Sequence, residues 1–228
     1  PVPAPPRPSG ISLELVAGTG MPGLGAEAVE SVQAEVDRVV DLVIEHALTR
    51  PESSLAVIAL NARHADRVRE AVLSTAAGAS VAAFFDPAAT EPFTVVDIES
   101  VAGLRRDTVI LTVGYGKTPH GRVLYRFGAV SSEHGAELLV DALDACRHRL
   151  TVVSCLAADD LDPERLRTRG AVALRDLLEF ARTGIAARSE IEEDERPPDR
   201  LLRDLADRLQ RLGLRVVPRY GPVGGVRI

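Results

Sequence analysis

The chain has 228 residues, of which 46% are hydrophobic and 26% are charged, and its formal net charge is −6. These values are typical of a globular protein that can bury a sizeable core. Its apolar runs are shorter than the roughly 18 residues that a membrane-spanning helix needs, and no basic and apolar leader precedes the first predicted strand. We therefore expect a cytoplasmic protein with no membrane partner.

The beginning of the chain predicts a linker, a strand and a loop. Residues 1–10 are rich in proline and have no apolar period, which is typical of a linker. Residues 11–16 then alternate as a short strand. Residues 18–23 match the G-x-G-x-x-G pattern of dinucleotide-binding turns, but Pro22 lies inside the turn and no second strand ends in an acid about 20 residues later. We predict a loose surface loop here, not a nucleotide site.

Apolar runs then alternate with stretches in which apolar residues recur every three or four positions. The predicted strands are 11–16, 54–60, 81–85, 93–98, 108–113 and 150–155. The predicted helices are 27–48, 61–73, 133–147 and one between Gly170 and Gly184, with inward faces Val29, Val32, Val36, Val39, Val40, Val43 and Ala47 on the first and Val172, Leu174, Leu177, Leu178 and Ala181 on the last. Asp162, before Pro163, should cap a helix start. This alternation predicts an α/β fold with a mostly parallel sheet in three layers.

The strands 93–98 and 108–113 enclose a short polar turn, which follows the carboxyl end of a buried strand. Open α/β sheets bind ligands at that end. The residues of this stretch that carry a family resemblance are Glu99, Val101, Gly103, Arg106, Asp107, Ile110, Leu111 and the run from Gly114 to Lys117. They resemble the fifth motif of superfamily 1 helicases, in the second RecA-like domain. The resemblance implies a RecA-like domain of the P-loop NTPase type over residues 11–184.

Further on, Arg126-Phe-Gly128, Glu133 and Gly135 resemble the loop before the sixth motif of that family, but the motif itself has become residues 136–147. The resemblance places the arginine that reaches the γ-phosphate at Ala145. Positions that match other functional residues of the family are occupied by Ala102, Arg105 and Ala136-Glu137, and His64 takes the place of a nucleotide-facing glutamine. We expect His64 to cap a helix or to pack.

The phosphate loop and the magnesium-binding acid belong to the first domain in that family, and neither is present here. Gly116-Lys117-Thr118 looks like the end of a Walker A loop, but Leu111 stands where its first glycine belongs and Pro119 follows it. We therefore expect no catalytic residue, and neither ATP nor magnesium as cofactor, in this chain. The expected remnants of the ATP site are Glu99, Gly103, Arg106, Asp107 and Arg147. Arg147 should pair with a neighbouring acid such as Asp144.

Cys146 and Cys155 are too few for a disulfide framework or for a zinc site, which needs four ligands, so we expect core residues and no metal. Charge is unevenly distributed, because residues 1–199 carry 20 basic against 31 acidic side chains and residues 200–228 carry 7 against 2. The candidate DNA contacts are Lys117, Arg122 and Arg126 in a long loop and Arg203, Arg208, Arg211 and Arg215 in the tail. The loop residues fit a solvated turn equally well. So few phosphate contacts predict weak, sequence-independent binding.

Residues 185–199 are acidic and interrupted by proline, which predicts a second linker. Residues 200–228 predict a helix with a leucine face and then a strand. This segment resembles the start of the restriction-endonuclease-like domain that often follows the motor in the same helicase subgroup. Because the chain ends before the metal-binding acids of such a domain, we assign no nuclease activity to it.

The sequence favours a non-hydrolysing, helicase-derived domain that acts as a nucleic-acid-binding or partner-binding scaffold in a DNA-processing protein. The first RecA-like domain of the parent protein is the expected partner. Two alternatives stay open. The chain is then either the second half of a working ATP-dependent motor, completed by a domain outside it, or a protein interaction domain without a role in nucleic-acid binding, which the acidic body favours.

Overall fold

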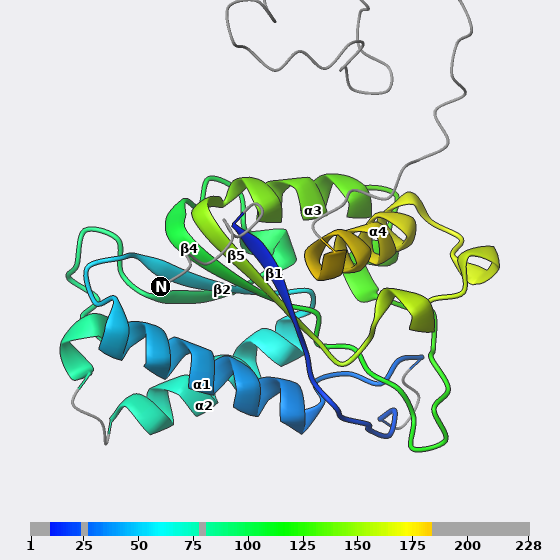
Figure 1. Ribbon diagram of the computed structural model, residues 1–228, viewed down its shortest axis with the longest axis horizontal. Helices are drawn as coiled ribbons and strands as arrows, with labels where there is room; N and C mark the ends of the chain where they lie inside the picture. Colours follow the sequence, from blue (N-terminus) through cyan, green and yellow to red (C-terminus); the bar gives the residue numbers. More distant parts are fainter. Residues whose placement is uncertain (1–9, 24–26, 78–80, 184–228) are drawn as a thin grey trace, which may run out of the picture. The chain divides into compact units, whose positions relative to one another are not determined.

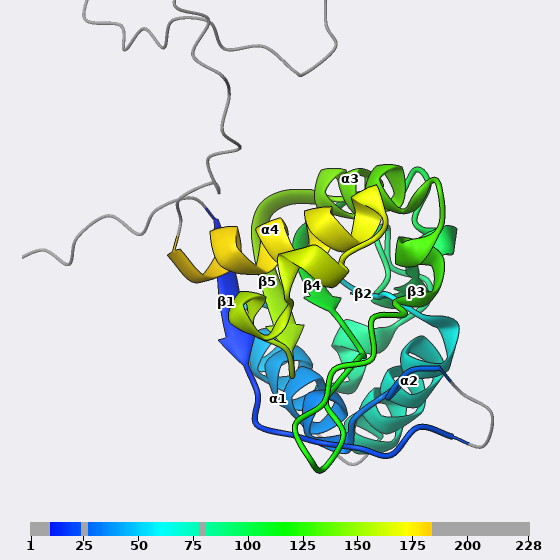
Figure 2. The ribbon, with the colours of Figure 1, turned by 90° about the vertical axis from the view of Figure 1, so that its right-hand side faces the viewer.

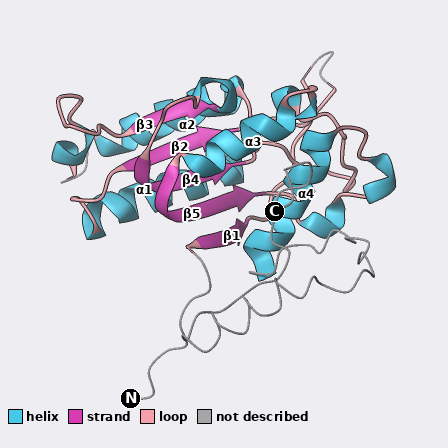
Figure 3. Cartoon of the chain, turned by 90° about the horizontal axis from the view of Figure 1, so that it is seen from above, coloured by secondary structure: helices cyan, strands magenta, loops and turns pink. Residues whose placement is uncertain are grey.

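A computed structural model describes residues 10–23, 27–77 and 81–183 (Figure 1). Their centre is a sheet of five strands: β1 (Ile11–Leu15), β2 (Leu55–Ala59), β3 (Thr94–Asp97), β4 (Arg106–Thr112) and β5 (Cys146–Ser154). All neighbouring strands are parallel, and their order is β1-β5-β4-β2-β3 (Figure 3). The predicted α/β fold with a parallel sheet is therefore confirmed.

Two pairs of helices cover the two faces of the sheet (Figure 2). Helices α1 (Gln33–Thr49) and α2 (Ala62–Ala76) lie on one face, and α3 (Gly135–Asp144) and α4 (Arg169–Thr183) lie on the other. Along the central strand β2 the side chains alternate between these layers, so that Val57 joins the core with α1 and α2, whereas Ile58 joins the core with α3 and α4. Burial on both faces explains why β2 is apolar at every position.

Three predicted elements are wrong in position or type. The predicted helix 133–147 is α3, which ends at Asp144, because β5 already begins at Cys146. Helix α1 begins at Gln33, six residues later than predicted, because Ser31 has a φ of 55°, which a right-handed helix does not allow. Val29 and Val32 are buried as expected, but they lie before the helix. The predicted strand 81–85 is a short 3₁₀ helix over Ala82–Phe85.

Three smaller expectations are also corrected. Val172, which we placed on the inward face of the last helix, is 42% exposed, whereas the other four predicted residues of that face are buried. Asp162 does accept a backbone hydrogen bond from Glu164, but it caps a 3₁₀ turn and not α4. The loop 18–23 is not loose at its start, because a Cβ on Gly18 would lie 2.8 Å from Val32.

Several predicted segments lie outside the described residues. They are the linkers 1–10, apart from Gly10, and 185–199, the nuclease-like segment 200–228, and the tail residues Arg203, Arg208, Arg211 and Arg215. Among the helices of the described part, none is long and apolar enough to cross a membrane.

Candidate functional site

The carboxyl ends of β2, β4 and β5 meet at one edge of the sheet, where ligands bind in open α/β folds. In this protein residues 28–32 cover that edge, and we call this segment the strap. Its Ser31 donates a backbone hydrogen bond to the Gly114 carbonyl at 2.8 Å, and its Val29 carbonyl accepts one from Gly116 at 3.0 Å. Val29 and Val32 pack with Cys155 in a small apolar cluster. The usual ligand-binding edge is therefore closed by the chain itself.

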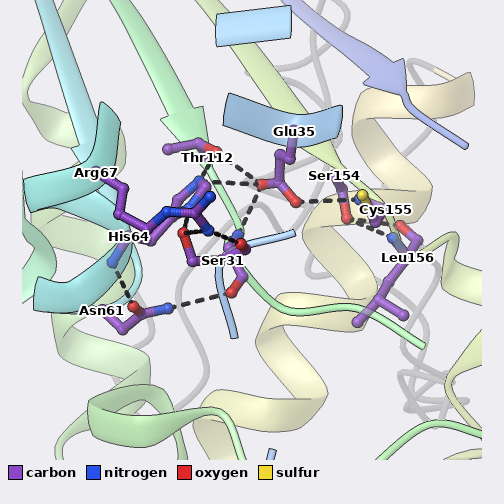
Figure 4. Close-up of polar contacts among 10 residues, drawn as sticks. Ser31, Glu35, Asn61, His64, Arg67, Thr112, Ser154, Cys155 and Leu156 are labelled. Carbon is purple, nitrogen blue, oxygen red and sulfur yellow. Dashed lines mark hydrogen bonds and ion pairs between the residues drawn. The ribbon is translucent and has the colours of Figure 1, made fainter. Parts of the chain in front are cut away.

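A buried polar network lies beneath the strap (Figure 4). Glu35, in the first turn of α1, is completely buried. Its Oε1 accepts hydrogen bonds from the Thr112 hydroxyl at 2.6 Å and from the Gly114 amide at 2.7 Å, and its Oε2 accepts a longer one from the Cys155 amide at 3.3 Å. Three donors thus surround one carboxyl group inside the core.

His64 is the second ionisable residue of the network, and it is also completely buried. It lies in the first turn of α2, where Asn61 caps the helix by accepting the His64 amide at 2.8 Å. The imidazole Nε2 is 2.8 Å from Thr112 Oγ1, and Nδ1 is 2.9 Å from Ser31 Oγ. Each ring nitrogen therefore faces a hydroxyl group, which can either donate or accept a hydrogen bond, so both tautomers of the imidazole fit these two contacts.

Arg67 completes the network at the surface. Its Nη1 donates to the Ser31 hydroxyl at 2.9 Å and also to the Ser31 carbonyl, and its Nη2 donates to Gln33. A continuous chain of hydrogen bonds therefore joins Arg67, Ser31, the imidazole, Thr112 and the carboxyl group. It joins the strap, α1, α2 and β4.

Burial acts on the two ionisable groups in opposite directions. It raises the pKa of Glu35 to about 7, although the hydrogen bonds from Thr112, Gly114 and Cys155 oppose this change. Burial also lowers the pKa of His64 to about 4, and the positive charge of Arg67 lowers it further. Glu35 Oε1 and His64 Nε2 are 3.8 Å apart. Because both pKa values favour the neutral form, we describe this contact as a neutral pair and not as a salt bridge.

This edge holds protons but offers no reactive group. Burial raises the pKa of the Cys155 thiol to about 12, and the neighbouring Glu35 raises it further, which makes the thiol a poor nucleophile. Within the described ranges, no three His, Cys, Asp or Glu side chains are grouped so that they could hold a metal ion.

Three of the five predicted ATP-site remnants lie at the opposite, amino edge of the sheet. Arg147 donates to both carboxylate oxygens of Glu91, at 2.5 and 2.8 Å, and to Asp107 at 3.2 Å. Its partners are therefore these two acids and not Asp144. The hydrogen bonds from Arg147 lower the pKa of Glu91 to about 2, and the backbone amide of Ser54 is the main cause of the lowered pKa of Asp107.

Arg106, the third remnant at this edge, donates to the Pro92 carbonyl from Nε and Nη2 and from its amide to the Ala145 carbonyl at 2.8 Å. Ala145 itself is completely buried. A cleft of about 340 Å³, lined by the turn 51–54 and residues that include Phe84 and Glu91, lies beside this edge.

Glu99 and Gly103 belong to the connection that leads from the end of β3 to the start of β4. Glu99 is exposed in a 3₁₀ turn, and Gly103 has a φ of 79°. In the described part of the chain, no hydrogen bond or ion pair joins either residue to Arg106, Asp107 or Arg147. The structure therefore brings together only part of the predicted set.

The predicted basic loop carries less free positive charge than the sequence indicated. Lys117 pairs with Asp160 at 2.7 Å, and Arg126 pairs with Glu27 at 3.2 Å. Arg122 is exposed and has no ion pair with a described residue. The roles of these residues in DNA binding remain predictions.

The sequence contained a signal for the buried network that we did not use. Glu35, Val39 and Val43 are spaced four residues apart, so a carboxylate stands on the buried stripe of α1. His64 precedes Val68 on α2 in the same way. A charged residue on an apolar helix stripe indicates a buried polar site, because such residues are seldom fully buried unless paired.

The described residues define a three-layer α/β domain with an all-parallel sheet. No family model matches the chain, and no curated protein matches it. Among solved structures, it is similar to the C-terminal domain of a possible DNA helicase from Lactobacillus plantarum WCFS1. The TM-score is 0.34 and the identity 18%, over 62% of this chain and 74% of that one. At this level the similarity carries no argument about function.

Proposed function

We propose that the described domain is a helicase-derived, RecA-like domain that does not hydrolyse ATP and serves as a scaffold in a DNA-processing protein. The proposal rests on the burial of Ala145 and on the ion pairs of Arg147. Ala145 stands where the resemblance expects the arginine that reaches the γ-phosphate, and it is buried in the core. Arg147, two residues later, has its donor groups engaged by Glu91 and Asp107.

The loss of this arginine has a large expected effect on catalysis. An arginine that stabilises the charge developing on a transferred phosphoryl group contributes roughly 10³ to 10⁵ in rate. Arg147 could replace the missing arginine only by breaking its ion pairs with Glu91 and Asp107. Arg147 also lies near the amino end of β5, at the edge of the sheet opposite the one where ligands bind in open α/β folds, and this position supports a domain that has given up hydrolysis and kept its fold.

Of the two scaffold roles, the contacts favour binding of a partner domain over binding of nucleic acid. The strap covers the carboxyl edge of the sheet, and Lys117 and Arg126 already have acidic partners. Binding to DNA would depend on Arg122 and on the tail arginines. With two or three phosphate contacts, the logarithm of the affinity should fall by about 0.9 per contact with the logarithm of the salt concentration on duplex DNA.

Two titrations of the 228-residue chain test the proposal. Calorimetry with ATP and magnesium should show very weak binding, and no phosphate should be released. Fluorescence anisotropy at low salt should show weak, sequence-independent DNA binding that is lost when Arg208, Arg211 and Arg215 are changed together to Ala. Magnesium-dependent ATP affinity in the micromolar range would support the alternative of a half motor, especially if Arg147→Ala removed it. If the chain binds no DNA at all, the remaining reading is a protein interaction domain without a role in nucleic-acid binding.

A further inference from the structure

We propose that the cleft at the amino edge of the sheet binds an arginine side chain of a partner protein, through the rings of Phe84 and Phe93 and the carboxylate of Glu52. The inference rests on the scaffold function proposed above, because it names the chemistry of the partner. The cleft has a volume of about 340 Å³, and the residues that line it precede β2 and β3 or belong to the start of β4.

The apolar part of the cleft is made of aromatic rings that are already fixed in place. Phe84 and Phe93 line the cleft and are partly buried, with ring centroids 6.2 Å apart. Phe85 packs edge to face against both rings, at 5.3 and 5.1 Å, and the ring of His46 lies 5.6 Å from Phe84. A guanidinium group stacks on such aromatic faces.

The polar part of the cleft carries three acids and no base, namely Glu52, Glu91 and Asp107. Glu91 and Asp107 have lowered pKa values, because hydrogen bonds stabilise their charged forms, so both are ionised at neutral pH. The cations that act on Glu91 are Arg147 and Arg106. Three carboxylates against two guanidinium groups leave a net negative charge, which favours a cationic ligand and disfavours a phosphate.

Glu52 is the acid that remains available to an incoming cation. It is exposed in the turn between α1 and β2, and it has no ion pair with a described residue. Glu91, in contrast, already accepts hydrogen bonds from Arg147 on both of its carboxylate oxygens. A guanidinium group in the cleft therefore meets two fixed rings and one unpaired carboxylate.

The turn 51–54, which forms one wall of the cleft, is held in place without a ligand. His46 Nε2 is 2.8 Å from the Ser53 carbonyl oxygen. The Ser54 amide donates to the Asp107 carboxylate at 3.1 Å, and the Asp107 amide donates to the Ser54 hydroxyl at 3.0 Å. A site that is ordered in advance loses less conformational entropy on binding, so a single side chain can bind measurably.

Arginine fits these features better than lysine does. Its planar guanidinium group stacks on aromatic rings and binds carboxylates through two parallel hydrogen bonds, whereas the lysine ammonium group is a compact and strongly hydrated charge. The volume of the cleft is near the lower end of the range for ligand sites, about 300 to 1,000 Å³, which suits one long side chain. Arginine is also enriched among the residues that contribute most to protein interfaces.

Nuclear magnetic resonance of the ¹⁵N-labelled 228-residue chain tests the inference with two peptides. One is acetyl-Ala-Arg-Ala-amide, and in the other citrulline replaces the arginine, so that a neutral urea group of the same shape replaces the guanidinium group. The arginine peptide should cause saturable shifts in the amides of Ser53, Ala83 and Thr90, which line the cleft. The citrulline peptide should bind roughly tenfold more weakly, because it loses the ion pair and the cation–π contact together.

Two variants and a control locate the binding. Glu52→Gln should weaken the binding of the arginine peptide roughly two- to fivefold, as expected for an exposed ion pair. Phe84→Leu should weaken it by about the same factor, through loss of the cation–π contact. Glu137→Gln, at an exposed position of α3 on the other face of the sheet, is the control and should leave the affinity unchanged.

The inference is overturned if the two peptides bind equally, if the shifts are centred outside the cleft, or if no saturable shift appears at millimolar peptide concentrations. An unchanged affinity in Glu52→Gln would also overturn it, and this result does not depend on whether Phe84→Leu folds. ATP binding and phosphate release are measured separately. A cleft that ignores the arginine peptide therefore leaves the non-hydrolysing scaffold standing, and ATP hydrolysis would refute the proposed function without changing the peptide result.

Discussion

The pair of Glu35 and His64 should make a part of the stability of the protein insensitive to pH, and single substitutions should reveal this. The pKa of Glu35 rises from 4.5 to about 7 on folding, so its contribution is fully present below pH 4.5 and is lost as the pH rises through 7. The pKa of His64 falls from 6.5 to about 4, so its contribution is fully present above pH 6.5 and is lost as the pH falls through 4.

Between pH 4.5 and 6.5 the two effects cancel, because the pair holds one proton in the unfolded chain and one in the folded chain. In Glu35→Gln the unfolded chain holds a proton on His64 and the folded chain holds none. The free energy of unfolding of this variant should then fall by about 1.4 kcal/mol for each pH unit of acidification, or up to about 2.7 kcal/mol over this range. His64→Gln should show the opposite slope.

Urea unfolding followed by circular dichroism at pH 4.5, 5.5 and 6.5 measures these slopes. The quantity of interest is the difference between each variant and the wild type, because other titrating groups then cancel. Glu45→Gln, at an exposed position of α1, is the control and should keep the wild-type slope. If Glu35→Gln and wild type lose stability in parallel on acidification, the opposed pKa changes are wrong.

Three further substitutions have expected outcomes. Gly114→Ala should lower the free energy of unfolding in urea by about 3 kcal/mol, because Gly114 has a φ of 66° and a Cβ there would lie 2.7 Å from the buried imidazole. Gly121→Ala is its control: the φ is 76°, but no atom lies near the added Cβ, so the change should cost only about 1 kcal/mol. Arg147→Ala should lower the free energy of unfolding only slightly at pH 7, because the ion pair is partly exposed, and the difference from wild type should shrink as the pH falls toward the pKa of Glu91, about 2. Ala145→Arg should lower the unfolding midpoint strongly and restore no ATP hydrolysis, because it buries an unpaired charge.

The strands could be predicted because buried parallel strands contain short apolar runs: β2 is apolar at every position, and β4 contains the buried run Val109-Ile110-Leu111. The strand predicted at residues 81–85 was wrong because an apolar run of this length does not distinguish a strand from a 3₁₀ turn. In the structure Phe84 and Phe85 pack edge to face, and both rings contact Phe93. That contact lies between residues distant enough in sequence that no local pattern indicates it.

The start of α1 and the buried network could not be predicted, for a related reason. Val29 and Val32 fit the spacing of the helix stripe, yet they belong to the strap, whose path depends on Ser31. Glu35 and Thr112 meet only after the sheet has formed, since they come from α1 and β4. The sequence could indicate that a carboxylate was to be buried, but not which donors would surround it.

The pairing of β1 with β5 has a consequence for how the protein is made. Ile11 lies opposite Leu150 and Leu15 opposite Ser154, so the first described strand bonds to the last. Contacts between such distant residues slow folding, because a long loop must close before they form. At a synthesis rate of about 5–20 residues per second, β1 waits roughly 7 to 28 s for its partner. During this time β1 and one side of β4 are open strand edges, the type of surface on which chains aggregate. Both edges become paired only when β5 has left the ribosome.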